Sequence, residues 1–241
     1  VLERFIGEGG GGHVWLAWDR RACRPVALKC LHLRYVDDRA AVARFAREAA
    51  LTGGLIHAGV VRVYDSGVLA DGTPFYAQRF VEGRTLAEAI EARRERGAVG
   101  VDFELLQRFA RVCWTVAYAH QQGVVHLDIK PSNLVLDHGK GVFLVDWGIA
   151  RRLDEPAAEG ANLYGTLGYM APECLRQGTA AGAEAADVYG LGITLFELLT
   201  SQRPFHARNE LMYAVKACHA AAPDPRDMAP GVPDALAALC N

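Results

Sequence analysis

The chain has 241 residues, of which 51% are hydrophobic, and its formal net charge is -2. This length suffices to bury a core as one domain or as two closely packed lobes, and the small charge provides no field that would gather nucleic acid or an anionic membrane. The six cysteines form no C-x-x-C pair, so the sequence shows neither a zinc pattern nor a disulfide framework and fits a cytoplasmic setting.

The sequence contains no signal-peptide layout and no uninterrupted apolar run of about 18 residues, so we expect no direct membrane contact from these residues. Because the chain begins without methionine and stops within a helical pattern, we expect it to be a piece of a longer polypeptide whose other parts could carry an anchor. Nothing in the sequence indicates the oligomeric state.

The first feature along the chain is a glycine run, GEGGGG, at residues 7–12. A flexible linker and a phosphate-holding loop both fit such a run taken by itself. Residues 14–30 then predict a strand, a turn and a second strand, which places Lys29 on the same face as Ala27. Apolar positions at helical spacing predict a helix over residues 39–55.

Two further strands are predicted around residues 60–64 and 75–80, after which the pattern becomes helical. Thr85 and Glu88 form a capping box at the start of one helix. A longer amphipathic helix is indicated by a stripe of Leu105, Phe109, Val112, Val116 and His120. The segment 187–200 is apolar nearly all round and predicts a buried helix, so we expect an α+β chain.

The densest chemical signal is VVHLDIKPSNLVL at residues 124–136, followed by VFLVDWGIA at 142–150. Four polar or charged residues stand in these otherwise apolar segments: Asp128, Lys130, Asn133 and Asp146. Buried charge is costly unless it binds a cation or a charged ligand, and Mg2+ takes oxygen ligands from carboxylates and substrate phosphates. The cluster therefore indicates metal-phosphate chemistry.

These motifs resemble, over essentially the whole chain, the catalytic domain of the eukaryotic-like serine/threonine protein kinases found in bacteria. The matching segments follow the family's order: G-x-G-x-x-G-x-V at 7–14, A-L-K at 27–29, Glu48, HLDIKPSN at 126–133, DWG at 146–148, GTLGYMAPE at 165–173 and DVYGLG at 187–192. One such match is weak, whereas this many in order are specific. Since the other motifs are present in this order, the glycines are expected to cover the phosphates of ATP.

The resemblance implies a bilobal fold that ends before the family's last helix. Residues 1–82 would form the ATP-binding N-lobe with the Glu48 helix, and residues 83–241 the C-lobe with the catalytic loop, activation segment and peptide-binding side. The implied catalytic residues are Lys29, Glu48, Asp128, Lys130 and Thr166. Lys29, paired with Glu48, would hold the α- and β-phosphates, and Asp128 would accept the proton of the substrate hydroxyl.

The resemblance also implies the nucleotide contacts: Ile6, Gly7, Glu8, Gly9, Gly10, Gly11, Gly12, Val14, Ala27, Lys29, Gln78, Arg79, Val81 and Val135. The adenine would lie between Val14 with Ala27 on one side and Val135 on the other. Its edge would meet the backbone of Arg79 and Val81.

Asn133 and Asp146 would hold Mg2+, with Mn2+ as an alternative, and Lys130 would meet the γ-phosphate. The implied partner is a protein substrate that bears serine or threonine, because the lysine in D-x-K-P-x-N resembles serine/threonine rather than tyrosine kinases. Two alternatives stay open, namely a pseudokinase scaffold and a small-molecule phosphotransferase of related fold. The complete catalytic set argues against the first, and GTLGYMAPE at 165–173 argues against the second.

Two residues are expected to support the loop without reacting. His126 would brace it from the core, and Asp187 would accept hydrogen bonds from its backbone. In three places the sequence departs from the family pattern: Leu127 replaces the arginine of H-R-D, Trp147 replaces the phenylalanine of D-F-G, and Gln78 stands where a hydrophobic gatekeeper is common.

An activating phosphate in the family pairs with the arginine that Leu127 replaces, and Thr166 is the only serine or threonine between residues 146 and 173. We therefore expect that activity does not depend on phosphorylation of this segment. Alternative receivers of a phosphate, or sources of permanent negative charge, are Arg151, Arg152, Asp154, Glu155 and Glu159.

Overall fold

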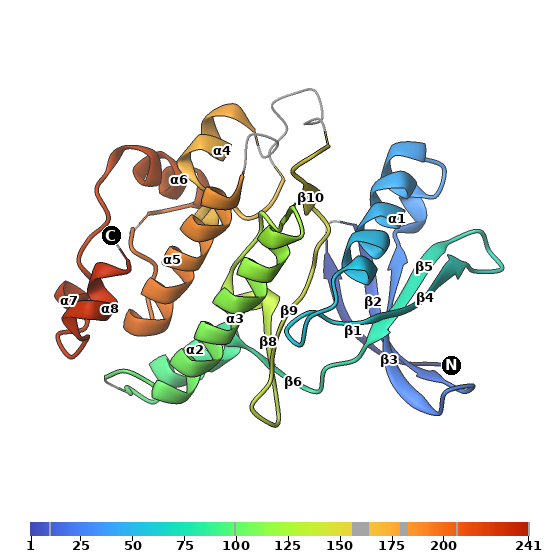
Figure 1. Cartoon of the computed structure of the whole chain (residues 1–241), viewed down its shortest axis with the longest axis horizontal. Helices are drawn as coiled ribbons and strands as arrows, with labels where there is room; N and C mark the ends of the chain where they lie inside the picture. The colour runs from blue at the N-terminus through green and yellow to red at the C-terminus, as the bar shows by residue number, and fades with distance from the viewer. Residues whose placement is uncertain (10, 99, 156–163, 179–182, 206, 241) are drawn as a thin grey trace. The chain divides into compact units, whose positions relative to one another are not determined.

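The computed structural model describes residues 1–9, 11–98, 100–155, 164–178, 183–205 and 207–240. The chain divides into two compact units, Val1–Glu82 and Gly83–Asn241 (Figure 1). The predicted α+β class is confirmed, because the first unit is built on a sheet and the second is mainly helical. Within the described residues, no helix combines the length and the apolar character needed to cross a membrane.

The first unit is a five-stranded antiparallel sheet of order β1-β2-β3-β5-β4 that carries helix α1. Its elements are β1 (Leu2–Gly9), β2 (Gly12–Asp19), β3 (Arg24–Leu31), the 3-10 helix η1 (Leu33–Tyr35), α1 (Arg39–Gly54), β4 (Val63–Val68) and β5 (Pro74–Arg79). The predicted hairpin and helix are confirmed. Strand β4 begins three residues later than predicted, and β1 is an additional strand whose sequence shows little alternation.

Helix α1 is fixed by a side-chain cap at its start and by packing along one face. The Asp38 carboxylate accepts from two amides of the first turn at 2.9 and 3.1 Å, which satisfies donors that have no partner within the helix. Phe45 packs with Leu31 and Tyr76 in the core of the unit. The same helix carries Glu48, which is 5% exposed.

The last pair of the hairpin between β1 and β2 is formed by two residues of the glycine run, Gly9 and Gly12. A Cβ atom on Gly12 would lie 2.1 Å from the carbonyl oxygen of Cys30, closer than a side chain can approach. The close approach of β2 to β3 therefore requires glycine at this position. By contrast, a Cβ on Gly7 or Gly11 would meet nothing within 4 Å among the described residues.

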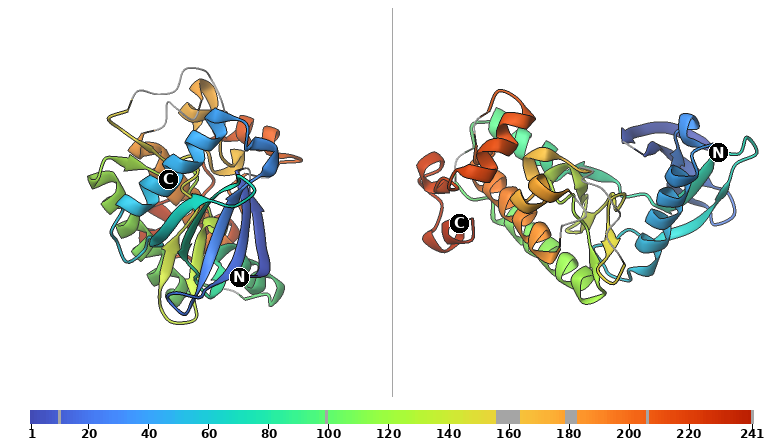
Figure 2. Two further views of the ribbon diagram at one scale, coloured as in Figure 1. Left: turned by 90° about the vertical axis from the view of Figure 1, so that its right-hand side faces the viewer. Right: turned by 90° about the horizontal axis from the view of Figure 1, so that it is seen from above.

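The second unit is built around helices α3 and α5, which lie side by side (Figures 1 and 2). Its elements are β6 (Gly83–Thr85), α2 (Leu86–Glu95), α3 (Phe103–Gln121), β7 (Val124–Val125), the 3-10 helix η2 (Pro131–Asn133), β8 (Leu134–Asp137), β9 (Val142–Leu144), β10 (Arg151–Arg152), the 3-10 helix η3 (Leu167–Tyr169), α4 (Pro172–Gln177), α5 (Glu184–Thr200), α6 (Glu210–His219), α7 (Pro225–Met228) and α8 (Asp234–Ala238).

Short strands flank the segment of this unit that the sequence predicts to be the catalytic loop. Strands β6, β8 and β9 form a small antiparallel sheet, and β7 pairs with β10. The predicted capping box is confirmed, since the Thr85 hydroxyl accepts from the Glu88 amide at 3.1 Å and the Glu88 carboxylate accepts from the Thr85 amide at 2.7 Å. The predicted buried helix is present as α5.

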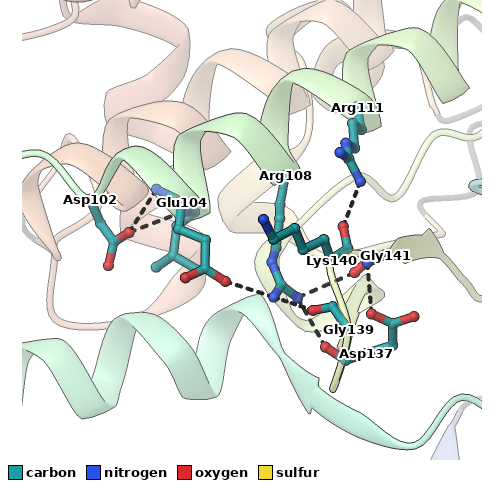
Figure 3. Close-up of polar contacts among 9 residues, drawn as sticks. Asp102, Glu104, Arg108, Arg111, Asp137, Gly139, Lys140 and Gly141 are labelled. Atoms are coloured by element: carbon teal, nitrogen blue, oxygen red, sulfur yellow. Dashed lines mark hydrogen bonds and ion pairs between the residues drawn. The ribbon is translucent and has the colours of Figure 1, made fainter.

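One arginine on α3 fastens the hairpin between β8 and β9 (Figure 3). Arg108 donates to the carbonyl oxygens of Asp137 at 3.0 Å, Gly139 at 2.6 Å and Gly141 at 3.3 Å, and pairs with the Glu104 carboxylate at 2.7 Å. The arginine is 9% exposed. The hairpin joins the strand that follows Asn133 to the strand that precedes Asp146, and Arg108 holds its turn against α3.

Replacing Arg108 by methionine should lower the free energy of unfolding by about 2 kcal/mol, because three carbonyl groups lose a hydrogen bond from its guanidinium, although that of Gly141 keeps the Asp137 amide as a donor. The matched control is Arg111→Met on the same helix. Arg111 is exposed and donates once, to the carbonyl oxygen of Lys140 at 2.6 Å, so its loss should cost about 0.5 kcal/mol or less. Urea denaturation measures both, and equal midpoints for the two variants would contradict the anchoring role.

Candidate active site

Lys29 on β3 and Glu48 on α1 form a buried ion pair in the first unit. The distance from Nζ to Oε1 is 2.5 Å, and the two residues are 8% and 5% exposed. The Tyr76 hydroxyl donates to the same Glu48 oxygen at 2.7 Å, and the Lys29 ammonium lies 5.9 Å from the centre of the Tyr76 ring. Buried charges are stable when they are paired and hydrogen-bonded, so Tyr76 supports a pair that the sequence motif alone identified.

Strand register brings several predicted nucleotide residues to one face of the sheet. Val14 lies opposite Lys29, Lys29 lies opposite Tyr76, and Ala27 lies opposite Gln78. Directly opposed residues share a face, as do residues two apart along a strand. Val14, Ala27, Lys29 and Gln78 therefore share a face with the hydroxyl that supports the ion pair.

The side chain of Glu8 belongs to the other face, because Glu8 lies opposite His13, the neighbour of Val14. Its carboxylate lies 3.6 Å from Nε2 of His32. The other predicted nucleotide residues are spread over both units: Ile6, Gly7 and Gly9 on β1, Gly11 in the turn, Gly12 on β2, Arg79 at the end of β5, Val81 beyond it and Val135 on β8. Gly10 lies outside the described residues.

Asp128 is the centre of a hydrogen-bond cluster in the second unit. Its Oδ2 accepts from Lys130 Nζ at 2.6 Å and from Asn133 Nδ2 at 3.0 Å, and its Oδ1 accepts from the Thr166 amide at 3.0 Å. Lys130 Nζ also donates to the Thr166 hydroxyl at 2.5 Å. Four predicted residues thus meet within hydrogen-bonding distance, three from the catalytic loop and one from the segment before α4.

A backbone hydrogen bond brings the chain next to Asp146 close to Asn133, the other predicted metal residue. The carbonyl oxygen of Asn133 accepts from the amide of Val145 at 2.9 Å, which holds the residue before Asp146 against η2. The Asn133 amide group donates to Asp128, which directs its nitrogen away from metal binding and leaves its side-chain oxygen as the ligand atom. Asp146 is exposed, at a φ of 63°. An amide oxygen and an exposed carboxylate fit a divalent cation that prefers oxygen.

Asp187 on α5 anchors the catalytic loop, as predicted. Its carboxylate accepts from the His126 amide at 2.8 Å and from the Leu127 amide at 2.7 Å, and Nε2 of His120 lies 2.8 Å from Oδ2. Leu127 has a φ of 67°, in the left-handed region that costs a residue with a side chain about 1–3 kcal/mol. The bond at its amide holds Leu127 in this conformation.

His126 braces the loop from the core, as predicted. It is 1% exposed, its Nδ1 accepts from the Asp128 amide at 3.2 Å, and its Nε2 lies 3.2 Å from the carbonyl oxygen of Val145. Because Nδ1 accepts, the proton is assigned to Nε2, which donates to Val145. The ring also packs edge to face on Trp147, with centroids 4.6 Å apart. Both nitrogens therefore serve the scaffold.

The buried ion pair in the first unit and the aspartate-centred loop in the second unit are arrangements that the protein kinase motifs predict. The chain belongs to the protein kinase domain family, whose match covers residues 1–231 and whose members use ATP and a divalent metal ion. The predicted family is thereby confirmed.

Curated relatives are bacterial serine/threonine-protein kinases. The chain is 36% identical over 236 residues to PrkC of Bacillus subtilis, which covers 98% of this chain and 35% of the relative. It is 38% identical over 245 residues to PknJ of Mycobacterium tuberculosis, with 99% and 40% covered, and 34% identical over 233 residues to PknD of Chlamydia caviae, with 86% and 25% covered. The chain thus spans two fifths or less of the length of these relatives.

Removing the Asp187 carboxylate should destabilise the second unit strongly. In Asp187→Ala, the buried amide of His126 and the partly buried amide of Leu127 lose their acceptor, and we expect a loss of about 3 kcal/mol or more in the free energy of unfolding. Glu184→Ala is the matched control, since Glu184 is an exposed acid in the first turn of the same helix and its loss should cost only a few tenths of a kcal/mol. Chemical denaturation compares them, and a loss below about 1 kcal/mol in Asp187→Ala would contradict the anchor.

Proposed function

We propose that this chain transfers the γ-phosphoryl group of ATP to serine and threonine hydroxyls of protein substrates in bacterial signalling. The observation that carries the proposal is the fixed Asp128 carboxylate, whose two oxygens are oriented by Lys130, Asn133 and Thr166. In this reaction Asp128 accepts the proton of the substrate hydroxyl. The hydroxyl oxygen bonds to the γ-phosphorus, and the bond from that phosphorus to ADP breaks, so that ADP leaves.

The reaction needs charge neutralisation more than covalent chemistry from the protein. When bound, ATP would supply the phosphoryl group, and Mg2+ would neutralise negative charge on the phosphate oxygens. Asn133 and Asp146 hold that ion, for which Mn2+ is an alternative, and their oxygen donors fit it. Lys29 holds the α- and β-phosphates while Glu48 and Tyr76 fix its position, and Lys130 approaches the γ-phosphate.

The choice of acceptor is supported by Thr166 and by the lysine two residues after Asp128. Thr166 links the segment that precedes α4 to the catalytic loop through Lys130 Nζ and the Asp128 carboxylate. In a small-molecule phosphotransferase, phosphate would appear on a small hydroxyl compound, and in a pseudokinase scaffold no turnover would occur. We further propose that the reaction takes place in the cytoplasm.

Lys29→Met and Asp146→Ala should each lower kcat/KM at least about 1000-fold, because each removes a charge that meets phosphate or metal. Asp128→Asn should lower kcat by at least about 100-fold while the affinity for ATP changes less than about threefold. The measurement is phosphate transfer to a peptide library with serine, threonine or tyrosine acceptors, together with ATP binding.

The matched controls are Lys140→Met and Asp37→Ala, which replace exposed residues and should retain wild-type rates. Circular dichroism and thermal melts establish that each variant is folded. Wild-type turnover in Asp146→Ala would refute the metal assignment. Transfer only to small hydroxyl compounds or to tyrosine would refute the proposed acceptor.

The position of Leu127 supports control without a phosphorylated activation segment. Leu127 packs with an apolar cluster formed by Met170, Ala171, Cys174 and Ala186, and its own side chain carries no charge that could pair with a phosphate. Two of the alternative residues neutralise one another, since Arg152 pairs with Asp154 at 3.0 Å. Glu159 lies outside the described residues.

Treating the active protein with a broad phosphatase should leave its rate within about twofold, because the partner that would hold an activating phosphate is missing. Mass spectrometry establishes that residues 146–173 carry no phosphate. The control is Tyr164→Phe, which removes an exposed hydroxyl from this segment. A fall of about tenfold or more that follows loss of phosphate from Thr166 or Tyr164 would overturn the expectation.

A further inference from the structure

Three side chains able to bind metal meet near the tip of the glycine-rich hairpin. Glu8 on β1 lies opposite His13 on β2, and His32 follows the end of β3. One ligand atom from each lies within 4.8 Å of the other two. By strand alternation this cluster is on the sheet face opposite to Val14 and Lys29, and the proposed phosphoryl transfer uses neither imidazole.

The spacing within the cluster is close to that of a metal site. Nε2 of His13 lies 3.0 Å from Nδ1 of His32, and Nε2 of His32 lies 3.6 Å from Oε1 of Glu8. Two ligands at the usual zinc distances of about 2.0–2.1 Å are about 3.4 Å apart in a tetrahedral arrangement. The two distances involve different nitrogens of His32, so the Glu8 side chain must change rotamer for all three residues to bind the same ion, while the strands can stay in place.

The burial of the three groups differs in a way that suits binding. His32 is 5% exposed and fixed between its neighbours, whereas the Glu8 side chain is 56% exposed and can change rotamer. This freedom matters because His32 offers an ion only one of its two nitrogens. Nδ1 of His13 is buried and neither donates nor accepts a hydrogen bond among the described residues.

The donor set selects the kind of metal. Two imidazoles and a carboxylate form a set that binds Zn2+ with a fourth position for water, whereas Mg2+ prefers oxygen ligands throughout. Cys30 lies opposite His13 on β3, but among the described residues its thiol does not belong to the group of ligand atoms that lie within 4.8 Å of one another. The set is therefore nitrogen and oxygen.

We propose that Glu8, His13 and His32 bind Zn2+, or a similar divalent transition metal, on this face of the sheet. Because Glu8 and His13 flank the glycines and His32 belongs to the end of β3, the ion ties the tip of the hairpin to the next strand. A consequence that rests on the proposed function is that bound Zn2+ restricts the hairpin and changes the affinity for ATP.

The test titrates Zn2+ alone, without nucleotide, into the metal-free, reduced chain by competition with a chromophoric chelator. We expect one ion per chain, with affinity reduced at least about tenfold in Glu8→Gln, His13→Gln and His32→Gln, because each loses one ligand. His219→Gln is the matched control, since His219 is exposed on α6, and it should bind as the wild type does. Co2+ should give the visible absorption of a tetrahedral nitrogen and oxygen site.

Equal Zn2+ affinity in all four variants, a thiolate charge-transfer band with Co2+, or no binding by the wild type would overturn the proposal. If His32→Gln fails to fold by circular dichroism, the exposed Glu8→Gln decides the outcome. ATP affinity measured with Mg2+, with and without Zn2+, tests the consequence separately. Loss of kinase activity alone would leave the Zn2+ titration unaffected, so failure of the two proposals can be distinguished.

Discussion

The organisation of the catalytic loop depends on one carboxylate that is almost completely enclosed. Asp187 is 1% exposed, and its oxygens receive two consecutive backbone amides and an imidazole. A buried charge in this position is tolerated because donors surround it, and in return it holds Leu127 in an otherwise unfavourable backbone conformation. The next residue is Asp128, so the anchor helps to orient the carboxylate that we propose as the proton acceptor.

Near this anchor, other buried polar side chains of the second unit also form hydrogen bonds that hold the backbone. His126 connects the loop to the strand end before Asp146, and Arg108 holds the hairpin on the far side of the same strands. In the first unit, the buried ion pair of Lys29 and Glu48 is likewise supported by a hydrogen bond, which the Tyr76 hydroxyl donates to Glu48. In both units, residues without a proposed chemical role hold the proposed catalytic side chains in place.

Local patterns in the sequence predicted local structure well. The capping box of Thr85 and Glu88 involves residues three apart and is confirmed, as is the hairpin of β2 and β3. The motif residues were identified because their order along the chain is specific to a family. Which of them bind nucleotide or metal stays a proposal, although Asp128, Lys130, Asn133 and Thr166 do meet as a group.

Contacts between distant residues could not be predicted in this way. Tyr76 is 28 residues from Glu48, and Arg108 is 29 residues from Asp137, so no local spacing relates them. The strand register that sets Glu8 on the face opposite to Val14 is likewise a property of the folded sheet. Strand β1 escaped prediction because pairing with β2, more than its own alternation, makes it a strand.

The glycines of the hairpin differ in whether the fold of the sheet requires them. Gly12 is required by the carbonyl group of Cys30, whereas Gly7 and Gly11 have room for a side chain. In a descendant released from selection for catalysis, Gly12 would persist as long as the sheet folds, while the other two would drift. In comparing homologues, an intact Gly12 therefore reports a stable sheet, and substitutions at Gly7 or Gly11 would be the earlier record of lost nucleotide binding.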